Sequence, residues 1–373
     1  MVRILIAPDK FKGSLTAQEV CDIISEYFGG KKNYRVTTLP LADGGEGTFE
    51  ILLNHFQGRA VETIVHDPLM RKISATYGLS GDGKTALIEM AKASGLQLLK
   101  TEDRNPLQTT TYGTGELIAH ALTQGVRNIV LGIGGSATND AGVGMATALG
   151  YKFFDQRGSE FIPLGGSDLS KIHSIDRTVH HQLAKVNVMT LCDVKNPLTG
   201  ANGASHVFAP QKGAGADDVL VLEMNMLHFQ RLLAERFIFD ATFEGAGAAG
   251  GLGAGSKFFL DSTMVSGMQY IADVTDLKKK IADSDIVITG EGKLDTQSSE
   301  GKVAAVVSQI AKSNNKRVVV VCGICDLDPT QLTSIGIDEC LELAKGVTLE
   351  YSLKNSTSLI RQKLSESRVL RDL

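Results

Sequence analysis

A glycine-rich segment spanning residues 128–150, NIVLGIGGSATNDAGVGMATALG, holds the residue types that bind anions. Its pattern predicts a buried strand, a glycine-rich turn and the start of a helix. Glycines let backbone N–H groups approach a phosphate, and Ser136, Thr138 and Asn139 add polar groups where a helix N-terminus carries partial positive charge. The alternative is an ordinary strand-to-helix connection, because glycine-rich turns are common in α/β proteins.

This turn matches one of two common nucleotide-binding patterns. The turn does not contain GxxxxGK[ST], and so lacks the lysine of that pattern. Gly132, Gly134 and Ala137 fit the relaxed dinucleotide pattern G-x-G-x-x-G/A, and Asp155 lies close to the offset expected for an acid that binds ribose. An NAD-dependent dehydrogenase of a small hydroxy acid is therefore one alternative.

Two clusters near the N-terminus combine glycine with charged side chains at predicted strand ends. In APDKFKGS, Asp9 and Lys12 lie at a strand-to-helix junction, where Ser14 would serve equally as the helix N-cap. In LADGGEGT, Asp43 precedes two glycines, which favours close approach of a ligand to the backbone. Both clusters are candidates for contact with an anionic substrate.

Three clusters farther along the chain have related compositions. In TYGTGEL, the backbone N–H groups of residues 113–115 precede an amphipathic helix and are candidates for phosphate contact. LCDVKNP places Asp193 and Asn196 after a predicted strand, where an Asp orients a hydroxyl or holds a hydrated Mg²⁺. TGEGKLDT places Glu291 and Asp295 in one loop, where the alternative is a solvent-exposed salt-bridge network.

Together these clusters favour phosphoryl transfer. That reaction needs backbone donors, lysines, Mg²⁺ held by carboxylates and one base for the attacking hydroxyl. Hydride transfer needs one dinucleotide turn and an apolar pocket beside the nicotinamide, and it leaves the acid–glycine–lysine clusters unexplained. A sensor that binds a sugar acid without turnover is a third alternative, although excess carboxylates would repel such a ligand.

Composition limits the classes of protein that this chain can represent. With 373 residues, a mean hydropathy near zero and a net charge of −4, it is expected to form about two globular domains and to bind no nucleic acid. No apolar run approaches the roughly 18 residues of a membrane helix, and MVRILIAPDK lacks the apolar stretch of a signal peptide. We expect a cytoplasmic protein with no membrane association.

The five cysteines are scattered, which argues against a disulfide framework and fits a reducing compartment. Cys322 and Cys325 have CxxC spacing after the predicted strand RVVVV. Because no second CxxC and no clustered histidines accompany them, the sequence does not predict a metal site there.

Hydrophobic periodicity predicts an α/β fold with two domains. Both ends of the chain show parallel strand–helix alternation, as in VRILIAPD and DSDIVITGEG, whereas alternating runs after Gln57 indicate antiparallel or mixed sheet. We predict a doubly wound parallel-sheet domain from residues 1–60 and 282–373, with a mixed α/β domain inserted at 61–281. Ligands bind such sheets at the carboxyl ends of the strands.

The motifs as a set resemble the type I glycerate kinase family. The segments that carry the resemblance are APDKFKGSLTAQEV, PLADGGEGT, YGTGEL, GIGGSATNDAGVGMATALG, CDVKNPLTGANGAS, FAPQKGA, GAAGGLGA and TGEGKLDTQSSEGK. The resemblance spans nearly the whole chain and implies a flavodoxin-like domain built from both termini with an inserted α/β domain. It also implies ATP-dependent phosphorylation of D-glycerate, most often at the 2-hydroxyl to give 2-phosphoglycerate; a glycerate 3-kinase is the alternative.

With this resemblance, roles can be assigned to individual side chains. Asp193 is the first candidate for the general base, and Asp43 is the second. Lys12, as a catalytic residue, Arg71 and Lys293 are expected to bind the glycerate carboxylate or to neutralise the transferring phosphate.

The cofactors implied are ATP and Mg²⁺, with Glu291 and Asp295 as the candidate Mg²⁺ ligands. The turn from Gly134 to Asp140 and the glycines of GAAGGLGA are expected to contact substrate or nucleotide phosphates. The substrate- or phosphate-binding candidates besides Arg71 and Lys293 are Asp9, Gly113, Thr114, Gly115, Gly134, Gly135, Ser136, Thr138, Asn139, Asp140, Asn196, Gly250 and Gly251. The expected partners are these small molecules, and a homodimer is possible.

The chain departs from the usual family pattern at three places. Lys10 stands where serine is commoner, Met70 where glycine usually precedes the arginine, and residues 322–325 where AGS-like residues are frequent. These departures concern local contacts rather than the resemblance itself.

Overall fold

The computed structural model describes residues 1–31, 33–42, 47–178, 183–295 and 302–371. Contacts divide the chain into two compact units: unit 1 comprises Met1–Ile51 and Gly267–Leu373, and unit 2 comprises Leu52–Ser266. The sequence analysis placed the boundaries later, after residues 60 and 281. Helices α9 (Gly267–Val274) and α10 (Leu277–Ala282) fall in unit 1 because they pack with each other and α10 packs on helix α11.

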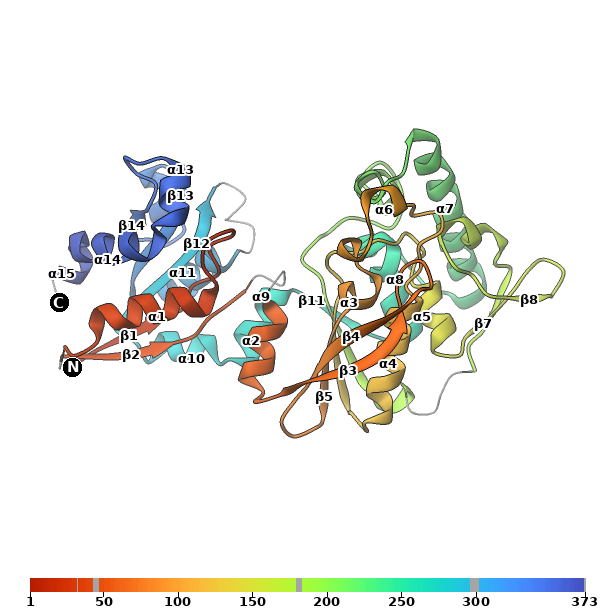
Figure 1. Ribbon diagram of the computed structural model, residues 1–373, viewed down its shortest axis with the longest axis horizontal. Helices are drawn as coiled ribbons and strands as arrows, with labels where there is room; N and C mark the ends of the chain where they lie inside the picture. Colours follow the sequence, from red (N-terminus) through yellow and green to blue (C-terminus); the bar gives the residue numbers. More distant parts are fainter. Residues whose placement is uncertain (32, 43–46, 179–182, 296–301, 372–373) are drawn as a thin grey trace. The chain divides into compact units, whose positions relative to one another are not determined.

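Unit 1 contains a parallel sheet of five strands in the order β14-β13-β12-β1-β2 (Figure 1). The strands are β1 (Val2–Ile6), β2 (Tyr34–Thr38), β12 (Ile286–Leu294), β13 (Arg317–Cys325) and β14 (Glu339–Glu342). Read from the other edge, this is the flavodoxin-like strand order, in which the direction of progression reverses between the first and third strands. The α/β class and the doubly wound sheet predicted from the sequence are confirmed.

Both faces of this sheet are apolar, as expected for parallel strands covered by helices. Ile4, Ile288 and Val321 pack in one buried cluster with residues of α1 and α14. Because side chains alternate along a strand, Leu5 and Val320 point to the opposite face. The helices of unit 1 are α1 (Ala17–Phe28), α9, α10, α11 (Val303–Ser313), α12 (Pro329–Ser334), α13 (Leu349–Lys354), α14 (Ser356–Glu366) and α15 (Arg368–Arg371), and α2 (Thr48–His55) crosses the boundary between the units.

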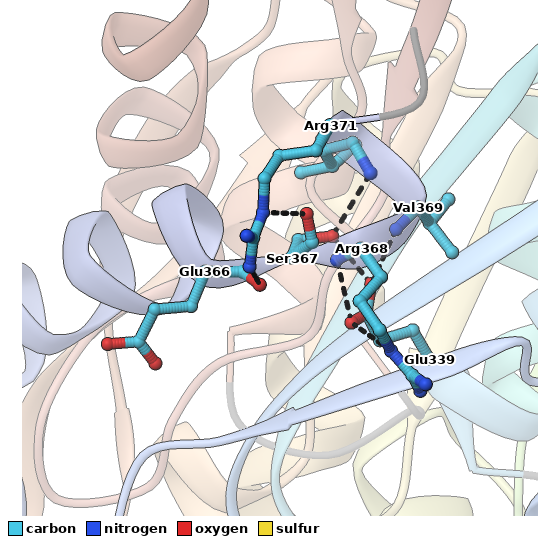
Figure 2. A network of polar contacts seen from close by, with 7 residues as sticks. Glu339, Glu366, Ser367, Arg368, Val369 and Arg371 are labelled. Carbon is cyan, nitrogen blue, oxygen red and sulfur yellow. Dashed lines mark hydrogen bonds and ion pairs between the residues drawn. The ribbon is translucent and has the colours of Figure 1, made fainter.

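The C-terminal helices of unit 1 are fixed to strand β14 through Glu339 (Figure 2). Its carboxylate accepts hydrogen bonds from the hydroxyl of Ser367 at 2.6 Å and from the backbone N–H groups of Arg368 at 2.9 Å and Val369 at 3.0 Å. Burial by itself would raise the pKa of Glu339, but these hydrogen bonds outweigh burial and hold the pKa below its usual value. The charged carboxylate therefore stabilises the packing of α14 and α15.

We expect Glu339→Gln to lower the free energy of unfolding by about 1.5–3 kcal/mol at neutral pH, the usual contribution of a hydrogen bond to a charged group. The contribution is complete above the ordinary pKa of 4.5 and is lost as the pH falls through the lowered pKa of the folded state. The stabilities of wild type and variant, measured by denaturant unfolding, should therefore converge in acid. Glu350→Gln, which removes an exposed carboxylate paired with Lys354, is the matched control and should have little effect.

Unit 2 contains a mixed sheet of six strands in the order β11-β10-β6-β5-β4-β3 (Figure 1). Strands β3 (Arg59–His66), β4 (Lys72–Leu79) and β5 (Thr85–Glu89) are antiparallel. Strands β5, β6 (Asn128–Gly132), β10 (Asn187–Leu191) and β11 (Thr263–Val265) are parallel. The alternating patterns in the sequence predicted an antiparallel or mixed sheet, and the structure shows that the sheet is mixed.

The rest of unit 2 consists of a small three-stranded sheet and helices packed around one apolar core that includes Phe153, Phe229 and Phe259. The small sheet contains β7 (Lys152–Phe154), β8 (Glu160–Phe161) and β9 (Ser174–Asp176). The helices are α3 (Ala91–Ser94), α4 (Tyr112–Thr123), α5 (Val143–Ala148), α6 (Ala204–Phe208), α7 (Ala216–Phe237) and α8 (Ala248–Leu260). Across both units, the described part of the chain contains no helix with the length and apolar character needed to cross a bilayer.

Candidate active site

A cavity of about 360 Å³ opens at the carboxyl ends of the strands of unit 1. Its walls come from the segment after β1, from the end of β12 and from the region around α13. This is the point where the strand order reverses, and open α/β sheets bind their ligands there. The charged residues that line the cavity are Asp9, Lys10, Lys12, Glu291, Lys293 and Lys302.

The segment after β1 is held on strand β12 and on the helical region near α13. Asp9 is 8% exposed, and its backbone N–H donates to the carbonyl of Gly290 at 2.8 Å. The helix cap that follows is Thr16, which forms a capping box with Glu19. The hydroxyl of Ser14 instead lies 2.6 Å from the hydroxyl of Ser356, so Ser14 is not the cap. The wall that carries Lys12 is therefore fixed at both of its ends.

Lysines and carboxylates alternate at the end of β12. The ammonium of Lys302 lies 3.1 Å from Oδ1 of Asp295 and 4.0 Å from Oε2 of Glu291. The ammonium of Lys293 lies 2.8 Å from a carboxylate oxygen of Asp326, whose hydrogen bond raises the pKa of Lys293. Glu291 is 5% exposed, so this is a partly buried network rather than the fully solvated salt bridges that were the alternative.

Unit 2 has a second polar region at the carboxyl ends of its parallel strands. Glu89, Gly132 and Leu191 are aligned across β5, β6 and β10, so the chain segments that leave these strands start side by side. Gly134 lies two residues after Gly132, and Asp193 lies two residues after Leu191. Both Gly134 and Asp193 are exposed. The structure thus brings two of the predicted site segments to one edge of one sheet.

A buried lysine fixes the glycine-rich turn after β6 through two hydrogen bonds. Lys212, which is 1% exposed, donates hydrogen bonds of 2.7 Å to the hydroxyl of Ser136 and of 2.7 Å to the carbonyl of Thr138. Burial lowers the pKa of Lys212 to about 7, and the nearby carboxylate of Asp140 opposes that shift. The turn is therefore fixed by an ammonium or amine group that the sequence analysis did not assign to the site.

Asp140 organises the other end of the same turn. Its buried carboxylate accepts hydrogen bonds from the backbone N–H and the hydroxyl of Thr111, each at 2.8 Å, and from the N–H groups of Gly142 at 3.1 Å and Gly144 at 3.3 Å. Burial raises the pKa of Asp140, and these hydrogen bonds oppose the rise. In this structure Asp140 binds the protein's own backbone, which accounts for its position in the motif.

Several other predicted binding residues have packing roles in unit 2. An added Cβ would lie 1.8 Å from the carbonyl oxygen of His66 at Gly113, and 2.3 Å from that of Met145 at Gly115. At Gly250, where φ is +68°, it would lie 2.0 Å from the carbonyl oxygen of Thr138. Such distances require glycine for close backbone packing. Gly251 is favoured mainly by its φ of +88°, because an added Cβ there would lie 3.0 Å from Cα of Ala141, a tight contact but not a clash.

Gly134 differs from these glycines, because an added Cβ there would meet nothing within 4 Å and its φ is not positive. The fold therefore accepts a side chain at this exposed position. A requirement for glycine would come from a ligand that approaches the backbone.

Comparison with known proteins decides the family. The family model described as the glycerate kinase family matches residues 4–370. The chain belongs to the glycerate kinase family. It is 43% identical to a glycerate kinase of Bacillus subtilis over 369 residues, which cover 97% of this chain and 95% of the relative. It is 42% identical to a glycerate 2-kinase of Escherichia coli over 359 residues, which cover 95% and 94% of the two chains.

A solved structure supports the same conclusion for the fold. A crystal structure described as that of a glycerate kinase 2 from Salmonella typhimurium LT2 matches with a TM-score of 0.87 at 40% identity, and the match covers 100% of this chain and 98% of that one. The resemblance drawn from the motifs is confirmed, and membership of this family makes the protein a kinase that transfers phosphate to an alcohol group.

This assignment makes the dehydrogenase alternative wrong. The acid that would have held the ribose, Asp155, lies in the turn between β7 and β8, where its carboxylate accepts the N–H groups of Arg157 at 2.8 Å and Ser159 at 2.9 Å. Its spacing from the glycine turn therefore reflects a hairpin and not a dinucleotide site.

The remaining predicted residues are placed as follows. Arg71 bonds to Asp67 at 2.6 Å and approaches Asp103 at 3.4 Å, so its guanidinium is already held by two carboxylates at the end of the β3–β4 hairpin. The amide of Asn196 donates to the carbonyl of Asn202 at 2.9 Å. The hydroxyl of Thr114 pairs with that of Ser94 at 2.8 Å.

Two buried polar atoms of the glycine-rich turn, Thr138 Oγ1 and Asn139 Oδ1, have no hydrogen-bond partner among the described residues. Asp43 lies outside the described residues.

Mg²⁺ fits the chemistry of the donors at the end of β12. Mg²⁺ is held in kinases by one or two carboxylates together with substrate phosphates, and Glu291 and Asp295 are carboxylates that share Lys302 as a neighbour. These two residues would hold the ion, which would supply neutralisation of phosphate charge. The nearby lysines would meet the remaining phosphate oxygens.

Proposed function

We propose that the protein phosphorylates D-glycerate with ATP at the 2-hydroxyl, giving 2-phospho-D-glycerate and ADP. The observation that carries this proposal is the cavity in unit 1, where two carboxylates and four lysines gather at the switch point of a doubly wound sheet, with Asp295 paired to one of these lysines. The name of the Escherichia coli relative, glycerate 2-kinase, supports the position of transfer.

The cavity provides the charge balance that phosphoryl transfer needs. Lys12, Lys293 and Lys302 present cationic groups to a phosphate, and Glu291 is available to a Mg²⁺ ion together with Asp295. Asp9, which is held in place by its backbone bond to β12, adds a carboxylate that orients the neighbouring backbone, since it accepts the N–H of Lys10 at 2.6 Å.

Unit 2, taken by itself, carries a candidate general base and a candidate backbone cradle for an anion at the carboxyl ends of its own parallel strands. Asp193 projects from the end of β10, where an exposed carboxylate can take the proton of an attacking hydroxyl. Asp43 remains the second candidate for this role. The exposed N–H groups at Gly134 and Gly135 form the part of the neighbouring turn that a carboxylate or phosphate can approach, while Ser136 and Thr138 hold that turn on Lys212.

We expect Gly134→Ala to lower kcat/KM roughly 10- to 100-fold by keeping the ligand from the backbone. The free energy of unfolding should change by no more than about 1 kcal/mol, because the added methyl group meets no protein atom within 4 Å. Steady-state kinetics and denaturant unfolding measure the two effects.

Gly250→Ala is the contrasting variant and should lose stability, because its Cβ would lie 2.0 Å from the Thr138 carbonyl oxygen. Full activity in Gly134→Ala would contradict a ligand-binding role for this turn.

The identity of the phosphorylated product tests the proposed reaction. Purified protein with D-glycerate, ATP and Mg²⁺ should release ADP only when all three are present, and phosphorus NMR should show 2-phosphoglycerate. Exclusive 3-phosphoglycerate would overturn the proposed position, and no ADP with any small hydroxy acid would overturn the substrate class. Removal of Mg²⁺ with EDTA should abolish turnover, because the ion neutralises phosphate charge during transfer.

Two further expectations belong to this proposal. We expect the enzyme in the cytoplasm, where ATP and glycerate are both present, and cell fractionation measures this. The sequence analysis named a homodimer only as possible, and light scattering on the purified protein would detect or exclude it.

A further inference from the structure

Three cysteines of unit 1 lie together at the end of the sheet, although the sequence separates one of them from the other two. The Sγ atoms of Cys322, Cys325 and Cys340 all lie within 4.8 Å of one another, and those of Cys322 and Cys340 are 3.5 Å apart. Among the residues described, no other group of three or more histidine, cysteine or acidic side chains is compact enough to hold a metal ion.

Strand pairing explains why these thiols meet. In the register of β13 and β14, Cys340 lies opposite Val320. Because side chains alternate along a strand, Cys322, two residues after Val320, projects from the same face of the sheet as Cys340. Cys325 ends β13, where its backbone N–H donates to a carboxylate oxygen of Glu342 on β14 at 3.3 Å. This contact places the thiol of Cys325 close to those of Cys322 and Cys340 on β13 and β14.

The geometry favours a shared metal ion over a disulfide. Cys322 and Cys340 are diagonal neighbours, and a strand spacing near 4.8 Å with a two-residue rise puts their Cα atoms about 8 Å apart. A disulfide needs Cα atoms within roughly 7 Å, so the strands would have to move to form one. Thiolates that share a Zn²⁺ ion with bonds of about 2.3 Å have sulfur atoms about 3.8 Å apart. The observed 3.5 Å is close to that spacing.

We propose that Cys322, Cys325 and Cys340 form a binding site for a thiophilic metal ion, with Zn²⁺ bound by three thiolates and one water. Each thiol releases its proton to solvent on binding. Thiolate ligands select zinc over the hard cations that carboxylates prefer, so this site is distinct from the Glu291–Asp295 pair. Cys322 is buried whereas Cys325 and Cys340 are partly exposed, which leaves the ion a route from solvent and a position for water.

The site has a structural consequence for the neighbouring strand. A bound ion would join β13 to β14 at the carboxyl end of β13. At this end β13 also pairs with β12, where Cys322 lies opposite Glu291 and Cys325 lies opposite Leu294. We expect Zn²⁺ to raise the melting temperature of the metal-free protein and to slow local opening at this end of the sheet. This inference does not depend on which hydroxyl of glycerate is phosphorylated.

Cobalt absorption tests the site directly. The full chain, reduced and freed of metal, is titrated with Co²⁺ without oxygen. We expect thiolate-to-cobalt charge-transfer absorption and intense tetrahedral bands that saturate at one ion per chain and disappear on addition of Zn²⁺. Cys325→Ser and Cys340→Ser should lose most of this absorption. Cys21→Ser, which changes a buried thiol of the same unit outside the cluster, should keep it.

Alkylation of the wild-type chain provides a measurement that does not depend on the folding of any variant. Zn²⁺ should protect Cys325 and Cys340 from iodoacetamide, as read by mass spectrometry, while the reactivity of Cys192 stays the same. The proposal is overturned if the folded wild type shows no thiolate–cobalt band, if Cys340→Ser shows the same band, or if Zn²⁺ gives no protection.

Discussion

Asp193→Asn is expected to lower kcat by roughly 10²- to 10⁴-fold, the usual contribution of a general base. The amide has nearly the same shape as the carboxylate but cannot take a proton, so substrate binding should change much less than turnover. Asp193 is exposed at the end of β10, and the replacement should leave the melting temperature unchanged. Steady-state kinetics with D-glycerate and ATP, together with a thermal unfolding curve, measure these effects.

Glu244→Gln is a suitable control for that variant. Glu244 is an exposed acid of the same unit, 3.8 Å from the ammonium of Lys195, and its loss should leave kcat unchanged. Wild-type turnover in Asp193→Asn would move the role of the base to Asp43, whose replacement by asparagine should then have the larger effect.

Lys212→Met is expected to lower kcat/KM by about 100-fold or more without direct contact between Lys212 and substrate. Methionine fills most of the space of the lysine stem but donates no hydrogen bond to Ser136 or to the carbonyl of Thr138. The glycine-rich turn then loses the two hydrogen bonds that fix the residues following Gly134. We therefore predict that Lys212 acts as a positioning residue, and its effect should appear in kinetics for both substrates.

The pH dependence of stability separates this role from simple packing. Burial lowers the pKa of Lys212 from 10.5 to about 7, so between these values the unfolded chain holds a proton that the native protein has lost. By linkage, the free energy of unfolding contributed by this group rises with pH across that interval, by no more than about 5 kcal/mol. Below pH 7 the native protein must hold the charged amine in its interior, and the gain is absent.

Denaturant unfolding at several pH values measures this slope. We expect the wild type to gain stability relative to Lys212→Met as the pH rises above 7, and the difference between the two should flatten near 10.5. Lys152→Met, which removes an exposed lysine paired with Glu160 at 3.2 Å, should have the pH slope of the wild type. Equal slopes in all three proteins would show that Lys212 has an ordinary pKa.

The sequence predicted much of the fold because the signals were local and repeated. Apolar runs such as those in β12 and β13 are long enough to mark buried parallel strands, and the change to alternating patterns marked the mixed sheet of unit 2. The order of the motifs also identified the glycerate kinase family, which the comparisons confirm.

Individual roles were harder to predict, because glycine and polar residues serve packing and binding with the same composition. Gly113 and Gly115 looked like phosphate contacts, yet each packs against a backbone carbonyl. Thr138 and Asn139 are fully buried, and each has a polar side-chain atom without a partner among the described residues, so their ligand contacts stay predictions. Whether a small residue faces a ligand or a neighbouring strand depends on burial, which local spacing does not encode.

The sequence by itself determined the two sheets, the family and the placement of charged clusters at the ends of strands, because these follow from short-range hydrophobic patterns. Only the tertiary structure decided that Lys212 supports the turn at Ser136 and that Cys340 joins the CxxC pair of β13. These contacts link residues far apart in the chain. They form because sheet register and burial bring distant segments together. Burial then sets the pKa of Lys212, and the register of β13 and β14 sets the spacing of the thiols.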